Sequence, residues 1–340
     1  MLGSWPPRCA VAATNGKPVV RIDDSGREAR HTGPMAQRVG IIGTGWVGTS
    51  VAFSTLMTGA ATELWLNDAR GAVAEGEALD LADGAAFYPR CAVKAVPLER
   101  MREADVVVIA AGRNGRPDES RLDLLRDNAR LAADIGRLLQ GFGGLVLVVS
   151  NPVDVLVRVV AQASGLPPER VLGTGTLLDS ARLRERLAQR LGVAAQAVHG
   201  QVIGEHGDSS VLLWHGARIG GVALRDWPGW QAEDETHIAQ SVRRAAYEVI
   251  QRKGATNHAI GLVTARLIAA VLRDERPLLP VSRVQNGVAG LHGVALSLPA
   301  LITPAGAVQV LEPDMDAAEC AALAASAAVL DKAYAQLSPS

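Results

Sequence analysis

Short apolar runs alternate with amphipathic stretches through the first half of the 340-residue chain. Continuous aliphatic runs are typical of strands buried on both faces of a parallel sheet, whereas apolar residues three and four positions apart predict a helix. The runs predict strands over 38–43, 63–68, 91–96, 105–111 and 145–149, and helices over 46–57, 71–86 and 122–139. This alternation predicts an α/β fold, with a doubly wound parallel sheet covered by helices on both faces.

The second half has a different pattern. Helical spacing predicts helices after a turn within 171–191 and over 233–253, 259–272 and 323–337, with strand-like stretches over 198–203, 210–214, 278–284 and 293–302. We therefore expect a C-terminal α+β domain over 161–340 behind an N-terminal domain over 38–160. Residues 1–37 lack periodicity and are interrupted by Gly, Pro, Asn and Asp, so we expect a disordered extension there.

Composition excludes several classes of protein. Hydrophobic residues make up 48% and charged residues 20% of the chain, and the net charge is −1, so we expect a globular protein that binds neither nucleic acid nor a membrane surface. Cys9, Cys91 and Cys320 are widely separated and odd in number. They show no disulfide framework and no zinc spacing, so we expect no metal and a reducing, cytoplasmic location.

A glycine-rich turn lies between the first predicted strand and helix. It reads Gly43-Thr44-Gly45-Trp46-Val47-Gly48. In a strand-turn-helix unit, the first glycine permits the tight turn, the second lets the backbone approach a pyrophosphate, and the third lets the helix pack on the strand. The helix N-terminus offers N–H groups to the phosphates. The turn therefore predicts a Rossmann dinucleotide site, although such glycine turns are common on their own.

An acid at the end of the next strand identifies the dinucleotide. Asp68 follows Gly48 by about 20 residues, the spacing at which a carboxylate accepts hydrogen bonds from the adenosine ribose. A 2′-phosphate would be repelled there, and no arginine replaces Asp68. The sequence therefore predicts NAD rather than NADP.

Candidate acid–base chemistry lies in the second half. His206 stands in the turn Gly204-Glu205-His206-Gly207, and Asp179 and Arg182 lie three apart on a predicted helix. A histidine acting as acid and base needs a carboxylate on its other ring nitrogen, and an arginine grips a carboxylate with two hydrogen bonds. Spacing alone leaves a second interpretation open, in which Asp179 and Arg182 form an ordinary surface ion pair.

An ordered set of motifs carries a resemblance to a known family. The chain resembles the L-lactate/malate dehydrogenase family, and its L-lactate dehydrogenases most closely, from residue 38 to about residue 337. The shared motifs are GTGWVGTSVA, AGRNGRPDESRLDLLRDN, VVSNPVD, GTGTLLDSARLR, GEHGDSS and KGATNHAIG. The resemblance implies an NAD-dependent L-2-hydroxy acid dehydrogenase, with a domain that binds NAD and a domain that binds the 2-oxo or 2-hydroxy acid substrate.

The resemblance also implies a role for each site residue. His206 would donate and accept the proton, with Asp179 as its partner and Arg182 as the clamp on the substrate carboxylate. Arg121 would polarise the substrate carbonyl and Asn151 would orient substrate and cofactor. Thr256 would face the substrate, and NAD would be bound by Gly43, Gly45, Trp46, Val47, Gly48 and Asp68. Arg184 and His199 would form an anion site for a sugar bisphosphate activator, between subunits of a homodimer or homotetramer.

One departure from the family pattern leaves the substrate open. Gly115 stands where lactate-type enzymes have Gln and malate-type enzymes have Arg, so it leaves volume beside the substrate side chain. We expect action on pyruvate or a bulkier 2-oxo acid. A malate dehydrogenase acting on a dicarboxylate is the nearest alternative, and a non-catalytic NAD-binding regulatory protein is an alternative of another class. Arg184 and His199 have a plainer interpretation as an exposed helical arginine and a strand histidine.

Overall fold

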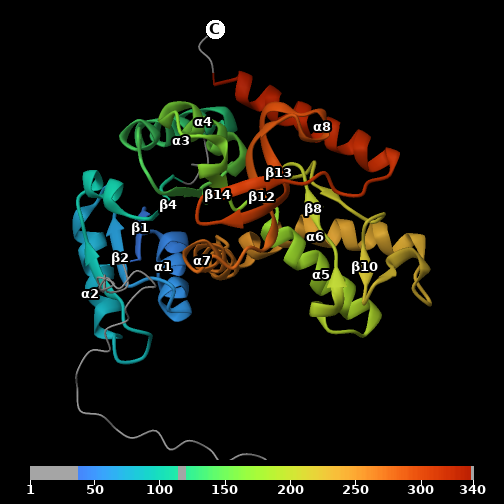
Figure 1. Ribbon diagram of the computed structural model, residues 1–340, viewed down its shortest axis with the longest axis horizontal. Helices are drawn as coiled ribbons and strands as arrows, with labels where there is room; N and C mark the ends of the chain where they lie inside the picture. Colours follow the sequence, from blue (N-terminus) through green and yellow to red (C-terminus); the bar gives the residue numbers. More distant parts are fainter. Residues whose placement is uncertain (1–36, 114–119, 338–340) are drawn as a thin grey trace, which may run out of the picture. The chain divides into compact units, whose positions relative to one another are not determined.

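The structure is a computed structural model that describes residues 37–113 and 120–337 (Figure 1). The expected N-terminal extension lies outside the described residues except for Gln37, whose backbone N–H donates to the Thr62 hydroxyl at 2.8 Å. Gly115 also lies outside them. No helix in the described ranges is long and apolar enough to cross a membrane.

The first half forms alternating strands and helices, as the apolar pattern predicts. These elements are β1 (Arg38–Ile42), α1 (Trp46–Thr58), β2 (Glu63–Asn67), α2 (Gly71–Asp83), β3 (Ala92–Ala95), β4 (Val106–Ile109), α3 (Arg121–Leu138), β5 (Leu145–Val148), α4 (Val153–Ser164) and β6 (Val171–Gly173). Their strands are all parallel, in the order β3-β2-β1-β4-β5-β6. The doubly wound parallel sheet is therefore confirmed.

Two helical layers cover this sheet, and alternate strand residues face one layer or the other. In β4, Val106 and Val108 pack into the core that includes α1, α2 and α7 (His258–Leu272). Val107 and Ile109 pack into the core that includes α3 and α4. Both faces of the strand are thus buried, which explains why its sequence is a continuous apolar run rather than an alternating one.

The second half adds a mixed α+β arrangement. Its elements are α5 (Leu177–Leu191), β7 (Val198–His199), β8 (Val202–Ile203), β9 (Val211–Leu212), β10 (Arg218–Ile219), β11 (Val222–Ala223), α6 (Ala232–Lys253), α7, β12 (Leu278–Asn286), β13 (His292–Thr303), β14 (Gly306–Val310) and α8 (Ala317–Ala335). Short 3₁₀ turns lie over Leu98–Glu103, Pro168–Arg170, Ala195–Ala197, Leu224–Asp226 and Val288–Gly290.

Three of the antiparallel strands, β12, β13 and β14, join the parallel sheet instead of forming a separate one. Strand β12 pairs with β13, β13 pairs with β14, and Ser282 of β12 pairs with Gly173 of β6. One nine-stranded sheet results, in the order β14-β13-β12-β6-β5-β4-β1-β2-β3. The fold class expected from the sequence is confirmed, and hydrogen bonding of the sheet continues past residue 160.

Two element predictions need correction. The single strand expected over 198–203 is two short strands, because Gly200 and Gln201 leave the extended ladder. Strand β7 pairs with β10, whereas β8 pairs with β9, so the two belong to different sheets. Helix α8 begins before residue 323, because Asp316 caps it and forms a capping box with Glu319.

Candidate active site

The three glycines of the turn before α1 have different surroundings. Gly43 has φ +95°, and a Cβ placed on it would lie 2.6 Å from Ala111 Cα. A Cβ on Gly48 would lie 1.8 Å from the carbonyl oxygen of Gly43, so α1 can approach β1 only without a side chain there. A Cβ on Gly45 would meet nothing within 4 Å. Packing therefore requires two of the glycines, and the third borders open space at the helix N-terminus.

The first turn of α1 carries the remaining residues of the motif. Trp46 is the first helical residue and is 61% exposed. Val47 lines a cavity that also reaches His206. No side chain caps the helix at Gly45. The N-terminal N–H groups of α1 thus remain available to an anion, as the dinucleotide prediction requires.

Asp68 follows β2 directly and closes the glycine turn. Its Oδ2 accepts the backbone N–H of Thr44 at 2.9 Å, and its Oδ1 accepts the backbone N–H of Arg70 at 3.0 Å. Burial alone would raise the pKa of Asp68, but these hydrogen bonds outweigh it and hold the pKa below the usual range. The carboxylate is therefore ionised, and its other lone pairs can accept hydroxyl groups of a ribose.

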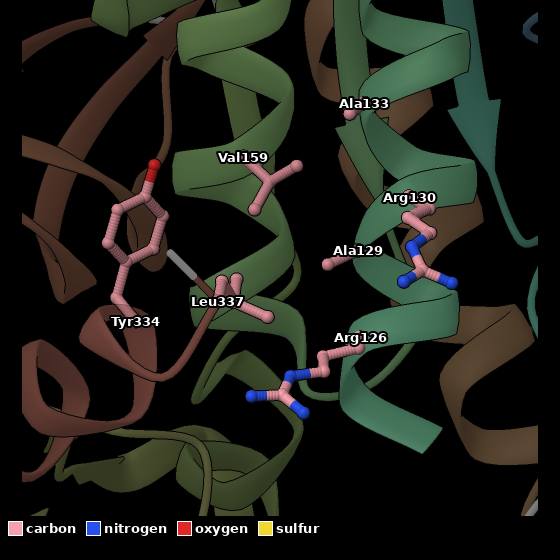
Figure 2. A pocket seen from close by; sticks show the side chains of 7 residues that line it. All are labelled: Arg126, Ala129, Arg130, Ala133, Val159, Tyr334 and Leu337. Atoms are coloured by element: carbon pink, nitrogen blue, oxygen red, sulfur yellow. The ribbon is translucent and has the colours of Figure 1, made fainter. Parts of the chain in front are cut away.

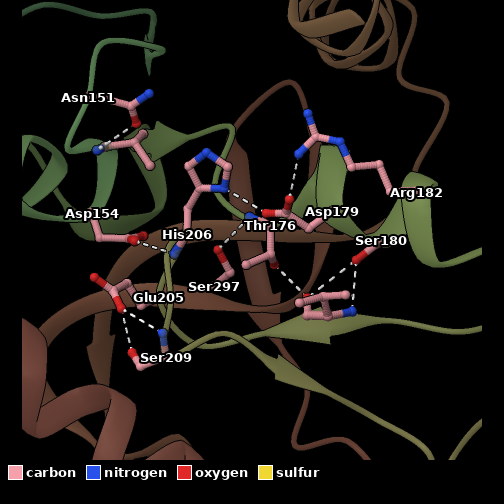
Figure 3. Close-up of polar contacts among 12 residues, drawn as sticks. Asn151, Asp154, Thr176, Asp179, Ser180, Arg182, Glu205, His206, Ser209 and Ser297 are labelled. Carbon is pink, nitrogen blue, oxygen red and sulfur yellow. Dashed lines mark hydrogen bonds and ion pairs between the residues drawn. The ribbon is translucent and has the colours of Figure 1, made fainter. Parts of the chain in front are cut away.

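His206, Asp179 and Arg182 lie together, as the sequence predicts (Figure 3). The Nδ1–H of His206 donates to Asp179 Oδ2 at 2.6 Å, and Arg182 Nη1 donates to Asp179 Oδ1 at 2.9 Å. The ion pair between Asp179 and Arg182 therefore forms, and the same carboxylate also orients the imidazole. The two interpretations of the helical pair are not exclusive.

The electrostatic environment favours a charged imidazole. Burial lowers the pKa of His206, but its hydrogen bond to Asp179 and the charges of Asp179 and Asp154 outweigh burial and raise it overall. Burial would raise the pKa of Asp179, yet the hydrogen bond from His206 and the charge of Arg182 hold it below its usual value. An ionised carboxylate thus faces an imidazole that keeps its proton more strongly than a free histidine.

Secondary structure on three sides fixes the turn that carries His206. Gly204, before the turn, exchanges two backbone hydrogen bonds with Ser297 of β13, at 2.9 and 3.0 Å. On the α5 side, the Ser180 hydroxyl accepts the backbone N–H of Val202 at 2.8 Å. On the α8 side, the Ser326 hydroxyl accepts the backbone N–H of Glu205 at 2.8 Å. The sequence does not predict these contacts, because serines on distant elements carry no spacing signal.

One cavity of about 360 Å³ brings together residues from both halves of the chain. Asn151, Arg182, His206 and Thr256 line it with Val47. The side-chain oxygen of Asn151 accepts the backbone N–H of Val153 at 3.3 Å.

Two further predicted residues fall in or near the part that the structure leaves out. Arg121 is the first residue of α3, but its side chain is outside the described set. Gly115 lies wholly outside it.

Arg113 lines the cavity that contains His206. The guanidinium of Arg113 bonds the Asp127 carboxylate through Nε at 3.1 Å and Nη2 at 2.6 Å.

The structure does not bring Arg184 and His199 into this cavity. Arg184 lies on α5, and burial lowers the pKa of its guanidinium. His199 is exposed on β7, where it pairs with Arg218 of β10. No hydrogen bond or ion pair joins the two side chains within the described residues, and the anion site stays a prediction.

A second cavity, of about 610 Å³, lies between α3, α4 and α8 (Figure 2). Its lining residues are Arg126, Ala129, Arg130, Ala133, Val159, Tyr334 and Leu337. None of the predicted site residues is among them, and Arg126 turns a guanidinium nitrogen to the carbonyl of Gln336 at 3.4 Å. The chemistry therefore points to the cavity that contains His206.

The glycine turn and the acid after β2 define the class of protein, a dinucleotide-binding α/β protein. Two family models match consecutive parts of the chain: lactate/malate dehydrogenase, NAD binding domain, over residues 37–173, and lactate/malate dehydrogenase, alpha/beta C-terminal domain, over residues 176–338. The chain belongs to the lactate/malate dehydrogenase family, and its cofactor is NAD.

Individual relatives align with this chain over nearly their whole length. The chain is 42% identical to L-lactate dehydrogenase 2 of Enterococcus faecalis, over 89% of this chain and 98% of the relative. It is also 42% identical to L-lactate dehydrogenase of Thermus aquaticus, over 88% and 99%. Among solved structures, the minor L-lactate dehydrogenase from Enterococcus mundtii in its ligands-bound form is similar, with a TM-score of 0.87 and 37% identity over 90% of this chain and 99% of that one.

Proposed function

We propose that the protein is an L-lactate dehydrogenase-type enzyme that interconverts pyruvate, or a related 2-oxo acid, and the L-2-hydroxy acid. The observation that carries this proposal is the 2.6 Å hydrogen bond from His206 to Asp179 at the wall of a cavity that Arg182 and Asn151 also line. An oriented acid–base group beside a carboxylate-binding cation is what reduction of a 2-oxo acid needs. The names of the relatives support the same reaction.

The chain's own residues account for the proton and the developing charge. Reduction places negative charge on the substrate oxygen, and a protonated His206 meets that charge and then transfers its proton to the oxygen. Asp179 stabilises the imidazole while it is charged and keeps Nε2 turned to the cavity, because Nδ1 is engaged. Arg182 binds the substrate carboxylate with guanidinium nitrogens other than the Nη1 that bonds Asp179.

The turn over 43–48 and Asp68 would hold NAD. The open space at Gly45, the N-terminus of α1 and the ionised Asp68 fit the pyrophosphate and the ribose. When bound, the nicotinamide supplies the hydride. We assign residues 38–160 to cofactor binding and residues 161–340 to substrate binding, with Asn151 orienting both partners and Thr256 facing the substrate.

Two features favour a monocarboxylate substrate over malate. A dicarboxylate needs a second cation in the cavity, because a buried unpaired carboxylate is costly. Gly115 supplies none, and the guanidinium of Arg113 already donates two hydrogen bonds to Oδ2 of Asp127. Arg121 would polarise the substrate carbonyl. The malate alternative and the non-catalytic alternative are not favoured, because the relatives are L-lactate dehydrogenases and the acid–base pair is intact.

A substrate panel tests this proposal. We expect NADH oxidation with pyruvate and with 2-oxobutyrate and phenylpyruvate, and poor activity with oxaloacetate. Gly115→Arg should improve kcat/KM for oxaloacetate, whereas Gly115→Gln should sharpen the preference for pyruvate. If the wild type prefers oxaloacetate to pyruvate by about 100-fold, equal to roughly 2.7 kcal/mol of transition-state binding, the lactate-type assignment is wrong.

We also propose a homo-oligomer, a dimer or a tetramer. Phe53 and Met57 of α1, Leu79 of α2 and Leu262 of α7 are between 53% and 69% exposed, which is unusual for large apolar side chains. Light scattering tests the oligomer directly.

In such an assembly, Arg184 and His199 would form an anion site for a sugar bisphosphate. Activation of the wild type by that ligand, and its loss in Arg184→Gln, would test the site. A cytoplasmic location is the last part of the proposal, supported by the free thiols of Cys91 and Cys320.

A further inference from the structure

Asp154 is a buried carboxylate outside the proposed acid–base machinery. It is the second residue of α4 and is 2% exposed. Val153, Val155, Leu156 and Val157 around it in the sequence are all buried apolar residues. An ionised carboxylate is seldom buried in such surroundings without a partner, because removing its charge from water is costly.

The hydrogen-bond partner of Asp154 is the backbone of the turn that carries His206. Its Oδ2 accepts the backbone N–H of His206 at 2.7 Å (Figure 3). Its Oδ1 is buried and no hydrogen bond of normal geometry reaches it among the described residues, but the hydroxyl of Ser282 on β12 lies beside the carboxylate and lowers its pKa. The backbone N–H of His206 and the Ser282 hydroxyl are therefore the polar groups that offset burial of this side chain.

The position of Asp154 links two site residues. Asn151 lies three residues earlier and accepts the backbone N–H of Val153. The segment 151–154 thus holds the Asn151 amide at the cavity and, within the same turn of chain, anchors the backbone of His206. A shift at the start of α4 would therefore move the Asn151 amide and the His206 backbone together.

We propose that Asp154 is a positioning residue that fixes the His206 backbone relative to Asn151 and adds negative charge behind the imidazole. It acts through His206 and does not touch the substrate. The inference rests on the proposed function, because it assigns Asp154 a part in the same reaction.

The charged groups around this contact determine how it responds to pH. Asp179 and Arg182 face the imidazole from α5, and Asp154 faces it from α4. Burial raises the pKa of Asp154 to about 6, with the negative charge of Glu205 acting in the same direction, while the Ser282 hydroxyl and then the backbone N–H and charge of His206 lower it. Above that pH the ionised Asp154 raises the pKa of His206, and the N-terminus of α4 partly compensates its charge.

Two substitutions separate the hydrogen bond from the charge. Asp154→Asn keeps an oxygen that can accept the His206 N–H but removes the charge, whereas Asp154→Ala removes both. Glu319→Gln and Glu319→Ala are matched controls, because Glu319 is also a buried carboxylate that accepts backbone N–H groups, those of Trp214 and His215. Each variant is assayed for kcat and KM against pH with pyruvate and NADH.

We expect Asp154→Ala to lower kcat by about tenfold or more, since a small displacement of an acid–base group is costly, with the KM for NADH changed far less. Asp154→Asn should retain most of the activity, and its decline at high pH should begin at a lower pH by a few tenths of a unit, because a negative charge near His206 is lost. The Glu319 variants should lower thermal stability without moving the pH profile.

A spectroscopic readout keeps the test independent of turnover. The His206 Cε1–H signal, assigned by its loss in His206→Asn, is titrated by NMR in wild type, Asp154→Asn and Glu319→Gln. A His206 titration in Asp154→Asn that superimposes on wild type, or an equal shift in Glu319→Gln, overturns the proposal. If no 2-oxo acid is reduced by the wild type, the proposed reaction fails, but the titration still decides the role of Asp154.

Discussion

The glycine turn before α1 and the histidine turn after β8 are both glycine-bounded loops at the ends of strands, yet they are stabilised differently. The glycine turn depends on neighbouring strands of one parallel sheet: Gly48 packs on Gly43, Gly43 lies against Ala111 after β4, and Thr44 bonds Asp68 directly after β2. The histidine turn depends on distant elements. His206 reaches Asp179 and Asp154, 27 and 52 residues away, and Glu205 reaches Ser326, 121 residues away.

This difference decides which region a sequence reveals. Contacts within one strand–helix–strand unit recur at a fixed spacing, so GTGWVG and Asp68 indicate NAD without a structure. The contacts of the histidine turn with α4, β13 and α8 carry no such pattern, although the family motifs point to His206, Asp179 and Arg182. The function of this turn depends on the fold bringing α4, α5, β13 and α8 to one place, so substitutions there should affect catalysis, while substitutions in the glycine turn should affect folding and cofactor binding.

The largest expected effect is at His206. His206→Asn should lower kcat for pyruvate reduction by about 100-fold or more, the low end for a positioned acid–base group, because His206 is the proton donor in the proposed reaction. The dissociation constant of NADH, measured by fluorescence, should stay near wild type, since the glycine turn is untouched. His215→Asn, a substitution at a half-exposed histidine beside Asp314, is the control. Wild-type turnover in His206→Asn would remove His206 from the mechanism.

The glycine turn offers the opposite test. Gly48→Ala places a Cβ against the Gly43 carbonyl and should cost about 1–3 kcal/mol of stability, as overpacking does. Gly45→Ala meets open space and should cost less than about 1 kcal/mol, yet it should weaken NADH binding because the backbone no longer lies bare toward the phosphates. Thermal melts with and without NADH measure both. Equal losses of stability would contradict the division of roles among these glycines.

Much of the fold and of the candidate site could be predicted from the sequence. The strand–helix alternation follows from apolar runs, and the His206, Asp179 and Arg182 cluster follows from the family motifs. Asp154 could not be assigned a role, although an acid inside an apolar helix was a signal that it is buried with a partner. The split of 198–203 and the joining of β12 to β6 also escaped prediction, because two-residue strands and single-pair contacts leave no periodicity.

The next largest effect is expected for Arg182→Lys. Arg182 uses Nη1 to bond Asp179, and only the planar guanidinium can hold that carboxylate and a substrate carboxylate together. We expect the KM for pyruvate to rise about tenfold, equal to roughly 1.4 kcal/mol. Arg186→Lys, one turn further along α5 and exposed, should leave KM unchanged. An unchanged KM in Arg182→Lys would leave Arg182 as an ion-pair partner of Asp179 alone.

Asp68 should show a smaller effect on cofactor choice. Wild type should use NADH far better than NADPH, and Asp68→Asn should narrow the ratio of kcat/KM values, because it removes the charge that repels a 2′-phosphate. The asparagine oxygen can still accept the Thr44 N–H, so the turn should stay folded. Asp68→Ala loses that bond too and should also melt earlier. A wild type that uses both cofactors equally would contradict the ribose assignment.

The smallest expected effect is the pH dependence of stability that the His206–Asp179 pair confers. The pKa of His206 is raised, so its contribution is complete below about 6.5, the ordinary histidine value, and is lost as the pH rises through the folded pKa. The pKa of Asp179 is lowered, so its contribution is complete above about 3.9 and is lost as the pH falls through the folded pKa. The stabilisation should therefore be greatest between about pH 4.5 and 6.

The difference in Tm between wild type and His206→Asn measures this contribution across the pH range. Both side chains are mostly buried, so we expect a maximum of about 1 kcal/mol, or roughly 2–4 °C, in that window and a decline on either side. The His215→Asn control should give a flat difference, because its partner Asp314 is largely exposed and the pair is screened by solvent. A difference for His206→Asn that instead grows steadily toward pH 9 would mean that the imidazole is neutral in the folded enzyme. In that case Asp179 would orient His206 without stabilising its charge, and the proton for reduction would have to come from a histidine that is protonated only after substrate binds.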